Sequence, residues 1–377
     1  PILLDLSGNV LARIEVGVTP GTTVNTRQKR GPRGLALHPA AARLYVLQHL
    51  TDTLTVVDTS TNTVLNERRL ATVDPMPLAQ REGRKFLYDS KLSGNGTMSC
   101  AACHIDGDID GIAWDLGDPN GTMQAAPVQP FPFSLLTLSQ FHPMKGPMTT
   151  QTLRGLAGTG RLHWRADRAD FQAFNPAFDK LMGGAQLAAA DMNAYAAFVN
   201  TMVHPPNPNQ QLNRAYRTTP AANNEAAGLV AFNQNITAFP IPGGASCNTC
   251  HTLPAATNGI VFPGNILQEP QQMKVPQFKN AYRKVGFART AGPQKSGFGY
   301  THDGALDTLT SFFSQPVFNP WPAATKDDIV TLLMVVDTGM APAVGYQFQL
   351  TQANASGPDV TADFALLIAR AVAADLE

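Results

Sequence analysis

The chain has 377 residues, and its 28 Lys and Arg residues balance 28 Asp and Glu residues, so the formal net charge is zero. A neutral chain lacks the basic surplus that phosphate binding needs, which argues against nucleic acid as a partner. Hydrophobic residues make up 44% of the sequence, which argues against intrinsic disorder. The length is typical of two or three domains.

The first 75 residues predict β-structure, because short apolar runs rich in Val, Leu and Thr alternate with turn residues. The runs are residues 2–6, 12–16, 34–37, 44–50, 54–57 and 63–70. The stretch from Leu35 to Val64 resembles one blade of a YVTN-type β-propeller, a four-stranded sheet. These residues supply at most about two of the four or more blades of a closed ring. We therefore expect a propeller remnant or a small sheet, whose exposed edge can pair with another chain or with missing blades.

A proline-containing linker at residues 74–77 precedes a predicted helix at residues 80–92. A second helix of this kind is predicted at residues 224–233. Each helix leads into a Cys-x-x-Cys-His sequence, and these two motifs contain all four cysteines of the chain. The motifs are Cys100-Ala101-Ala102-Cys103-His104 and Cys247-Asn248-Thr249-Cys250-His251.

The Cys-x-x-Cys-His pattern is typical of c-type haem attachment. Two thiols three residues apart can reach both vinyl groups of one porphyrin, and the adjacent His can bind the iron. A zinc site would usually space two such pairs by about 15 to 20 residues, whereas Cys103 and Cys247 are 144 residues apart. A disulfide framework is typical of shorter secreted chains, and a thioredoxin-like pair does not require the His. We therefore predict two covalently attached haem c groups.

Covalent haem attachment also predicts the compartment. In bacteria haem c is attached in an oxidising space outside the cytoplasm, so we expect a periplasmic or extracellular protein. The sequence has no run of 18 apolar residues and thus predicts no transmembrane segment. It starts at Pro1 without a signal peptide, and we expect it to be a processed or truncated product.

The two halves of the chain repeat the same order of features. Trp164 and His302 each follow a haem motif and precede Phe171 and Leu309 by seven residues. Each half then closes with a predicted helix. These helices are expected at residues 188–202 and 325–336. We expect a mainly α fold with two cytochrome c-like haem domains in tandem, at residues 76–212 and 213–345, between the β-sheet segment at 1–75 and a C-terminal tail at 346–377.

From about residue 80 to residue 340 the chain resembles the bacterial di-haem cytochrome c peroxidase and MauG superfamily. It is most similar to a branch in which a YVTN propeller precedes the di-haem module. Besides the two haem motifs, the runs at residues 146–155 and 300–304 carry this resemblance. The two family features that are missing are a Met or Tyr at the position of Pro316 and a Glu at the position of Gly184. Both absences argue against classical peroxidase activity.

The resemblance implies roles for several residues. His104 and His251 are the proximal iron ligands, and Trp164 is an electron relay between the haems. His302 lies near the propionates of the second haem. Residues 297–301 bind calcium through backbone oxygens.

Other candidates come from the residues themselves, each with an alternative. Met340 or His302 can be the sixth ligand of the second haem. The alternatives are that Met340 packs in the core and that His302 only forms hydrogen bonds. His142 and His163 are ligands or acid–base groups at the first haem, or structural histidines. Arginines around Trp164 pair with haem propionates or lie on the surface; they are Arg154, Arg161, Arg165 and Arg168. Trp114 is expected to pack. The acidic residues Asp106, Asp108 and Asp110 resemble a calcium loop but lack its Gly and Glu.

These observations predict an oxidoreductase. Electrons would pass between two covalent haems and reduce hydrogen peroxide, or activate oxygen, at the first haem. The expected partner is a redox protein or a small electron donor. The alternative is a non-catalytic electron-transfer cytochrome or a subunit of a larger redox complex.

Overall fold

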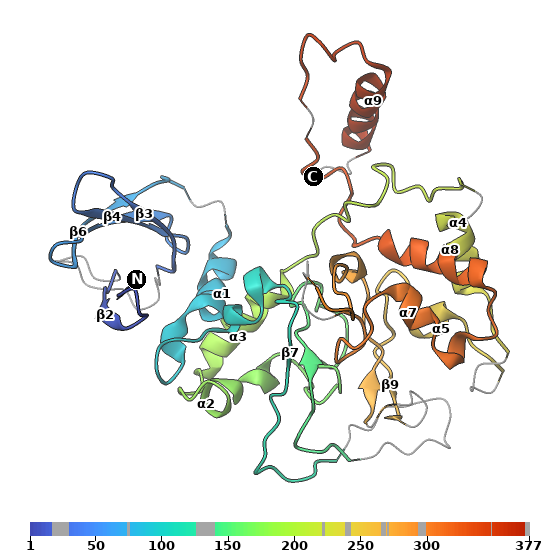
Figure 1. Cartoon of the computed structure of the whole chain (residues 1–377), viewed down its shortest axis with the longest axis horizontal. Helices are drawn as coiled ribbons and strands as arrows, with labels where there is room; N and C mark the ends of the chain where they lie inside the picture. Colours follow the sequence, from blue (N-terminus) through green and yellow to red (C-terminus); the bar gives the residue numbers. More distant parts are fainter. Residues whose placement is uncertain are drawn as a thin grey trace. The chain divides into compact units, whose positions relative to one another are not determined.

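The computed structural model describes residues 1–16, 30–73, 76–125, 140–220, 223–237, 243–264, 269, 271–292, 299–347 and 349–373. The fold is mainly helical with small sheets (Figure 1). It forms two compact units. Unit 1 comprises residues 1–107 and 171–201, and unit 2 comprises residues 108–170 and 202–377. The chain thus leaves unit 1 after the first haem motif and returns to it for 31 residues.

Unit 1 begins with β-structure, as predicted. The hairpin β1 (Ile2–Leu4) and β2 (Val10–Arg13) is followed by a four-stranded antiparallel sheet in the order β3-β4-β5-β6. Its strands are β3 (Pro32–Leu37), β4 (Arg43–Gln48), β5 (Thr53–Asp58) and β6 (Thr63–Arg69). One small core of Ile14, Val16, Val46 and Val57 holds these strands.

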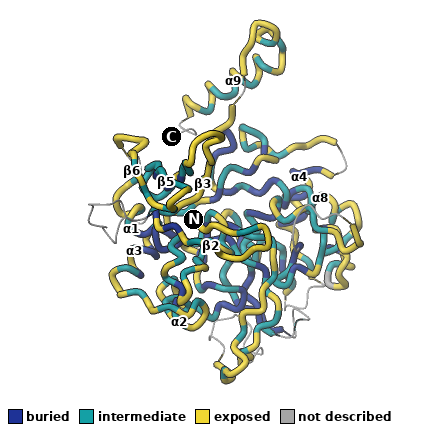
Figure 2. The backbone as a smooth tube through the Cα atoms, turned by 60° about the vertical axis from the view of Figure 1, so that its left-hand side comes forward, coloured by how far each residue is buried: buried dark blue, intermediate teal, exposed yellow. Residues whose placement is uncertain are grey.

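Much of this sheet is exposed or of intermediate burial, as Figure 2 shows, and several of its leucines are exposed. The exposed leucines are Leu35, Leu37, Leu47 and Leu65. A single four-stranded sheet agrees with the predicted small sheet, while its relation to a propeller stays a prediction.

A pair of helices follows in unit 1. Helix α1 (Leu78–Tyr88) buries Gly83, Phe86 and Leu87, and it packs against α3 (Ala189–Asn200). The helices cross at Gly83, where a Cβ atom would lie only 2.1 Å from the carbonyl oxygen of Ala194. Only glycine therefore permits this close approach. The short helix α2 (Ala177–Lys180) lies in the same unit.

Unit 2 contains a matching pair of helices. Helix α4 (Glu225–Asn233) begins where the Asn224 side chain accepts a hydrogen bond from the backbone of Ala227. It packs against α8 (Ala323–Met334), and a Cβ at Gly228 would lie 2.2 Å from the Asp328 carbonyl oxygen. The four helices predicted at residues 80–92, 188–202, 224–233 and 325–336 are thus confirmed, with ends that differ by a few residues.

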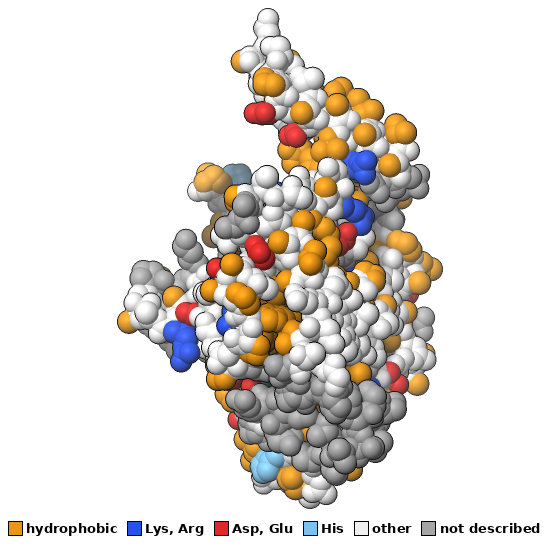
Figure 3. Space-filling view, turned by 90° about the vertical axis from the view of Figure 1, so that its right-hand side faces the viewer, with side chains coloured by type: hydrophobic (Ala, Val, Ile, Leu, Met, Phe, Trp, Pro, Cys, Tyr) orange, Lys and Arg blue, Asp and Glu red, His pale blue; other side chains and the backbone are white. Residues whose placement is uncertain are grey.

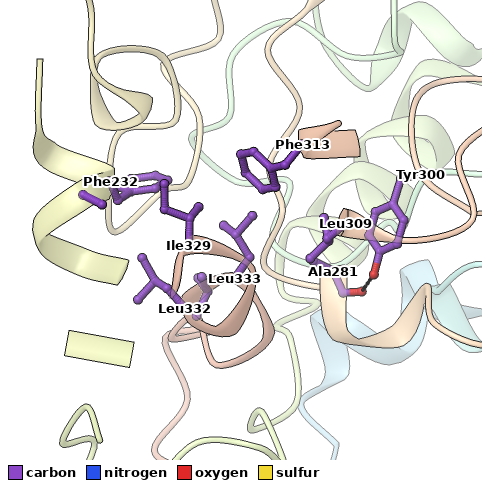
Figure 4. Packing of buried hydrophobic residues seen from close by; sticks show 10 residues of the cluster. Phe232, Ala281, Tyr300, Leu309, Phe313, Ile329, Leu332 and Leu333 are labelled. Carbon is purple, nitrogen blue, oxygen red and sulfur yellow. Dashed lines mark hydrogen bonds between the residues drawn. The ribbon is translucent and has the colours of Figure 1, made fainter. Parts of the chain in front are cut away.

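The main core of unit 2 surrounds α8 and α7 (Leu309–Phe313) (Figure 4). Phe232, Ile329, Leu332 and Leu333 meet there, and the Tyr300 hydroxyl donates to the Ala281 carbonyl at 3.1 Å. Two short hairpins complete the unit, β7 (Ala113–Trp114) with β8 (Met148–Thr149), and β9 (Val261–Phe262) with β10 (Met273–Lys274). Short 3₁₀ turns in both units span Ser90–Leu92, Cys100–Ala102, Ile105–Gly107, Gln172–Phe174, Ala281–Arg283 and Pro316–Phe318.

The predicted C-terminal tail contains a helix that the sequence analysis did not anticipate, α9 (Pro358–Val372), none of whose residues is buried. On the face that Figure 3 shows, charged side chains are sparse and scattered, in keeping with a charged fraction of 15%. Among the described residues, no helix combines the length and the apolar character that a membrane crossing requires.

Candidate haem centres

The first motif, Cys100 to His104, lies in unit 1. It follows helix α1 and the 3₁₀ turn at Ser90–Leu92. Ser99 precedes a 3₁₀ turn at Cys100–Ala102, and the backbone N–H of His104 donates to the Cys100 carbonyl at 2.9 Å. The Cys100 thiol shares a hydrogen bond with the hydroxyl of Tyr195, a buried residue of α3. Burial raises the pKa of the Cys100 thiol, so it is neutral and not a reactive thiolate.

The second motif lies in unit 2 on the short helix α5 (Cys247–Cys250). Ser246 and Thr249 cap it reciprocally, because each side chain accepts a hydrogen bond from the backbone N–H of the other. Burial raises the pKa of Cys247 to about 12 and also raises that of Cys250. One helical turn therefore presents two neutral thiols, and both of them pack against apolar clusters.

The structure argues against the other interpretations of these cysteines. None of the four cysteines, all of which lie in the described residues, forms a disulfide. A thioredoxin-type pair would carry a thiol with a lowered pKa, whereas burial raises the pKa of three of these thiols. In the part of the chain that the structure describes, no three His, Cys, Asp or Glu side chains gather in a way that could hold a metal ion.

His251 has the arrangement of an iron ligand. Its Nδ1 lies 3.1 Å from the carbonyl oxygen of Pro276 and 3.3 Å from that of Ala256. Because both neighbours are acceptors, Nδ1 carries the proton and Nε2 is left to bind a metal. Burial lowers the pKa of His251, which keeps the ring in the neutral form that ligation needs. The Phe278 ring, with its centroid 5.0 Å away, adds an apolar wall.

Trp164 is buried in unit 2 and is held on two sides. Its indole Nε1 donates to the Thr149 carbonyl at 2.8 Å, and its own carbonyl accepts from the backbone of Lys274 at 2.7 Å. Lys274 lies two residues before Pro276, whose carbonyl contacts His251. A single extended segment, from Lys274 to Pro276, therefore connects Trp164 to His251 of the second motif.

Arg165 is buried beside Trp164, and it fits a carboxylate ligand. Its Nη1 donates to the carbonyl of His142 at 2.8 Å and to Gln271 at 3.1 Å, and its guanidinium lies 4.6 Å from the Phe141 ring centroid. Its Nε is buried and has no hydrogen-bond partner within the described residues. A buried donor without a partner is costly, and a haem propionate would satisfy it.

His163 forms a pair with Asp167. Its Nδ1 lies 2.7 Å from the Asp167 carboxylate, which also has Arg168 at 3.4 Å and Arg165 at 3.7 Å. Burial acts to raise the pKa of Asp167, but the hydrogen bond from His163 and the nearby cations outweigh it and hold the pKa well below its usual range. Burial lowers the pKa of His163, although Asp167 opposes this effect. The pair thus holds an imidazole in a fixed orientation at a site where its side chain is 34% exposed.

The other predicted ligands and acid–base groups are His142, His302 and Met340, and each lies in its own environment. His142 is exposed, and its Nδ1 accepts from the backbone of Met144 at 3.1 Å. The His302 imidazole lies 3.8 Å from the Glu269 carboxylate, and its carbonyl accepts from Thr149 at 2.6 Å. Met340 is partly buried in the bend after α8. In the proposed calcium segment, residues 297–298 lie outside the described residues.

The structure accounts for one missing family feature. A Cβ at Gly184 would lie 2.0 Å from the carbonyl oxygen of Leu92, so no side chain fits where the family places a Glu. Pro316, where the family has a Met or Tyr, begins a 3₁₀ turn.

The acidic residues of the first post-motif loop do not form a calcium loop. Asp106 pairs with Arg33, Asp108 pairs with Arg154 and Arg283, and Asp110 accepts from the indole of Trp114 at 2.8 Å. Trp114, which was expected to pack rather than to relay electrons, is 37% exposed and lies in strand β7. Of the other arginines, Arg161 donates to the Ala166 carbonyl at 2.6 Å.

Two residues of unit 2, His204 and Lys284, were not predicted from the sequence as site residues. His204 is buried beside Gly155, where a Cβ would lie 2.7 Å from its Nε2. Burial lowers the pKa of His204 to about 4, helped by the charges of Lys279 and Arg154. Lys284 lies over the ring of Trp164. No local pattern marks either residue, since their neighbours come from distant parts of the chain.

Comparison with known proteins gives one family match. Residues 80–242 match the family described as di-haem cytochrome c peroxidase. The match supports the predicted superfamily, a haem cofactor and a redox function. None of the curated protein sequences matches this chain.

Several solved structures are distantly similar to the chain. Hydrazine synthase of Kuenenia stuttgartiensis, pressurised with xenon, is 15% identical over 71% of this chain and 90% of its own, with a TM-score of 0.45. A MauG-like protein associated with microbial copper homeostasis is 16% identical over 71% and 91%, with a TM-score of 0.42. A variant of the diheme peroxidase BthA from Burkholderia thailandensis is 15% identical over 72% and 90%, with a TM-score of 0.36.

Proposed function

We propose that the chain is a di-haem c-type cytochrome that reduces hydrogen peroxide with electrons relayed by Trp164. The family match of residues 80–242 supports the redox class. The observation that carries the proposal is the connection in unit 2 from Trp164 through Lys274 and Pro276 to His251. A buried, fixed indole joined to the proximal histidine of a haem motif is suited to electron transfer.

The residues that would hold the two haems follow from the motifs. Cys100 and Cys103 would bind one porphyrin with His104 on its iron, and Cys247 and Cys250 would bind the other with His251. Met340 and His302 remain the candidates for the sixth ligand of the second haem. When bound, haem supplies one-electron redox chemistry and an iron that can bind a small oxidant.

The chain's own groups would then move electrons and protons. Reduction of peroxide consumes two electrons and two protons and yields two molecules of water, so Trp164 must pass electrons singly. We assign proton transfer to the His163–Asp167 pair or to His142. Arg165 would bind a haem propionate with its buried Nε.

Thioether attachment supports a periplasmic or extracellular location. The electron donor would then be a redox protein or a small reductant from that space. The exposed edges of the four-stranded sheet would pair with another chain or with further propeller blades. For calcium, the proposal is limited to binding at residues 297–301.

A non-catalytic electron-transfer cytochrome is the second candidate. The lack of space for a side chain at Gly184 favours this second function, because that position offers no carboxylate to assist peroxide cleavage. In this case peroxide would leave the reduced protein unchanged.

Stopped-flow mixing of the reduced holoprotein with hydrogen peroxide separates the two functions. The proposal predicts fast oxidation of both haems, seen as two phases in the Soret region. Trp164→Phe should slow the second phase by on the order of a hundredfold, equivalent to about 2.7 kcal/mol in the barrier. Trp114→Phe, at an exposed indole, is the matched control and should leave both phases unchanged. Lack of any oxidation by peroxide would favour the electron carrier, and unchanged phases in Trp164→Phe would remove the relay.

A further inference from the structure

Lys284 places a cation over the ring of Trp164. Its Nζ lies 5.3 Å from the centroid of the indole, and both residues belong to unit 2. Lys284 is partly buried, directly after the 3₁₀ turn at Ala281–Arg283, where its backbone N–H donates to the Ala281 carbonyl at 3.0 Å. Within the described ranges its ammonium group has neither a carboxylate partner nor a hydrogen-bond acceptor. The indole is thus its principal partner.

This contact favours one redox state of Trp164 over the other. A cation over an indole face is attracted by the electrons of the neutral ring. When the ring loses an electron it becomes positively charged, and the same ammonium group repels it. The contact therefore stabilises reduced Trp164 and opposes its oxidation.

The hydrogen bond of the indole makes this repulsion persist. Its Nε1–H donates to the backbone carbonyl of Thr149, which cannot accept a proton at neutral pH. Oxidised Trp164 therefore keeps its proton and its positive charge for as long as it lasts. A carboxylate or imidazole partner would have removed the proton and with it the repulsion.

We propose that Lys284 controls, through its charge, how readily Trp164 gives up an electron, so that loss of the Lys284 proton accelerates transfer through the indole. This inference deepens the proposed function and rests on it. With haem bound at the two motifs, Trp164 would give up one electron to the oxidised centre and regain one from the reduced centre. Lys284 acts through Trp164 and is a positioning residue.

The pH range follows from the surroundings of Lys284. Burial lowers its pKa to about 8, so the ammonium form dominates below that pH and the neutral amine above it. Relay through Trp164 should be slow below pH 8 and fast above it. The charged groups on neighbouring segments have other partners. Arg283 and Arg154 pair with Asp108, Lys274 donates to the Arg161 carbonyl at 2.6 Å, and Arg165, Arg168 and His163 surround Asp167.

The test measures the second oxidation phase after peroxide mixing from pH 6 to pH 10. The wild-type rate should rise by about tenfold through pH 8. Lys284→Met should be fast and independent of pH, and Lys284→Arg should be slow and independent of pH, because arginine keeps its charge. Lys279→Gln is the matched control, since burial also lowers the pKa of Lys279 but its ammonium group interacts with the Asp337 carboxylate. It should keep the wild-type profile.

A second readout does not depend on turnover. In the reduced holoprotein labelled with 13C at lysine Cε, the Lys284 resonance is identified by its loss in Lys284→Met. It should titrate near pH 8 and show a ring-current shift that Trp164→Leu removes. A wild-type slope that survives in Lys284→Met, or a Lys284 resonance without that shift, would overturn the inference alone. Unchanged oxidation phases in Trp164→Phe would overturn the relay itself and this inference with it.

Discussion

The two haem motifs share a scaffold but differ in their surroundings. In unit 1 the motif follows α1, which crosses α3 at Gly83, and in unit 2 it follows α4, which crosses α8 at Gly228. The thiols differ, because Cys100 shares a hydrogen bond with a tyrosine, whereas Cys247 packs against the apolar cluster around α8. The scaffold is therefore repeated while the surroundings of each motif are individual, as the proposed two haems with different tasks would require.

The largest expected effect tests the shared scaffold. Alanine normally stabilises a helix interior relative to glycine by about 1 kcal/mol. At Gly83 and Gly228 the added Cβ would lie 2.1 and 2.2 Å from a backbone carbonyl, so the helices must separate. We expect Gly83→Ala and Gly228→Ala each to lower the free energy of unfolding by about 3 kcal/mol, measured by urea denaturation. Val230→Ala, at a side chain that is 71% exposed, is the control in α4. A stabilising effect of either glycine variant would show that the crossings are not as tight as described.

A smaller effect concerns the ion pairs beside Trp164, in unit 2. The pKa of Asp167 is lowered in the folded protein, so its carboxylate contributes stability that is complete above the ordinary pKa of 3.8 and is lost as the pH falls below it. Asp167→Asn should lose about 2 kcal/mol at pH 7 in urea denaturation. The difference from wild type should shrink below about pH 4.

The control for Asp167 lies in unit 1. Asp179 carries an ion pair with the exposed Lys180, and Asp179→Asn should change stability by well under 1 kcal/mol. An Asp167→Asn loss that is the same at pH 3 and pH 7 would contradict the assigned ionisation.

The smallest effect separates the two motif environments. Tyr195→Phe removes only the hydrogen bond to Cys100, and Tyr300→Phe removes only the bond to the Ala281 carbonyl in the core of unit 2. Each should cost about 1 kcal/mol. In spectroelectrochemical titrations Tyr195→Phe should shift the midpoint of one haem and leave the other unchanged. A shift of both midpoints would mean that the two environments are not separate.

Local patterns were enough to predict much of this molecule. The Cys-x-x-Cys-His motifs, the four-stranded sheet and the four helices of the two pairs depend on neighbours in sequence, such as Asn224 at the start of α4. Contacts between distant segments could not be predicted in this way. Lys284 lies 120 residues from Trp164, and the crossing partners of Gly83 and Gly228 are about 100 residues away.

Other features failed for physical reasons that the sequence does not carry. The hydrogen bond from the Trp114 indole to Asp110, at a side chain that is 37% exposed, was not predicted. Helix α9 was not predicted. It buries no residue, and the sequence indicated no segment against which its apolar side chains would pack. The loss of the family Glu was visible at Gly184, but only the structure reveals that the Leu92 carbonyl occupies the space.

The central claim is that each motif holds one covalent haem. Mass spectrometry of the denatured chain tests it most directly, because only thioether-bound haem survives unfolding. We predict the sequence mass plus two haems for the wild type, and plus one haem for both Cys100→Ala/Cys103→Ala and Cys247→Ala/Cys250→Ala. A wild-type mass with one haem or none, from protein matured in a cell able to attach haem c, would contradict the account.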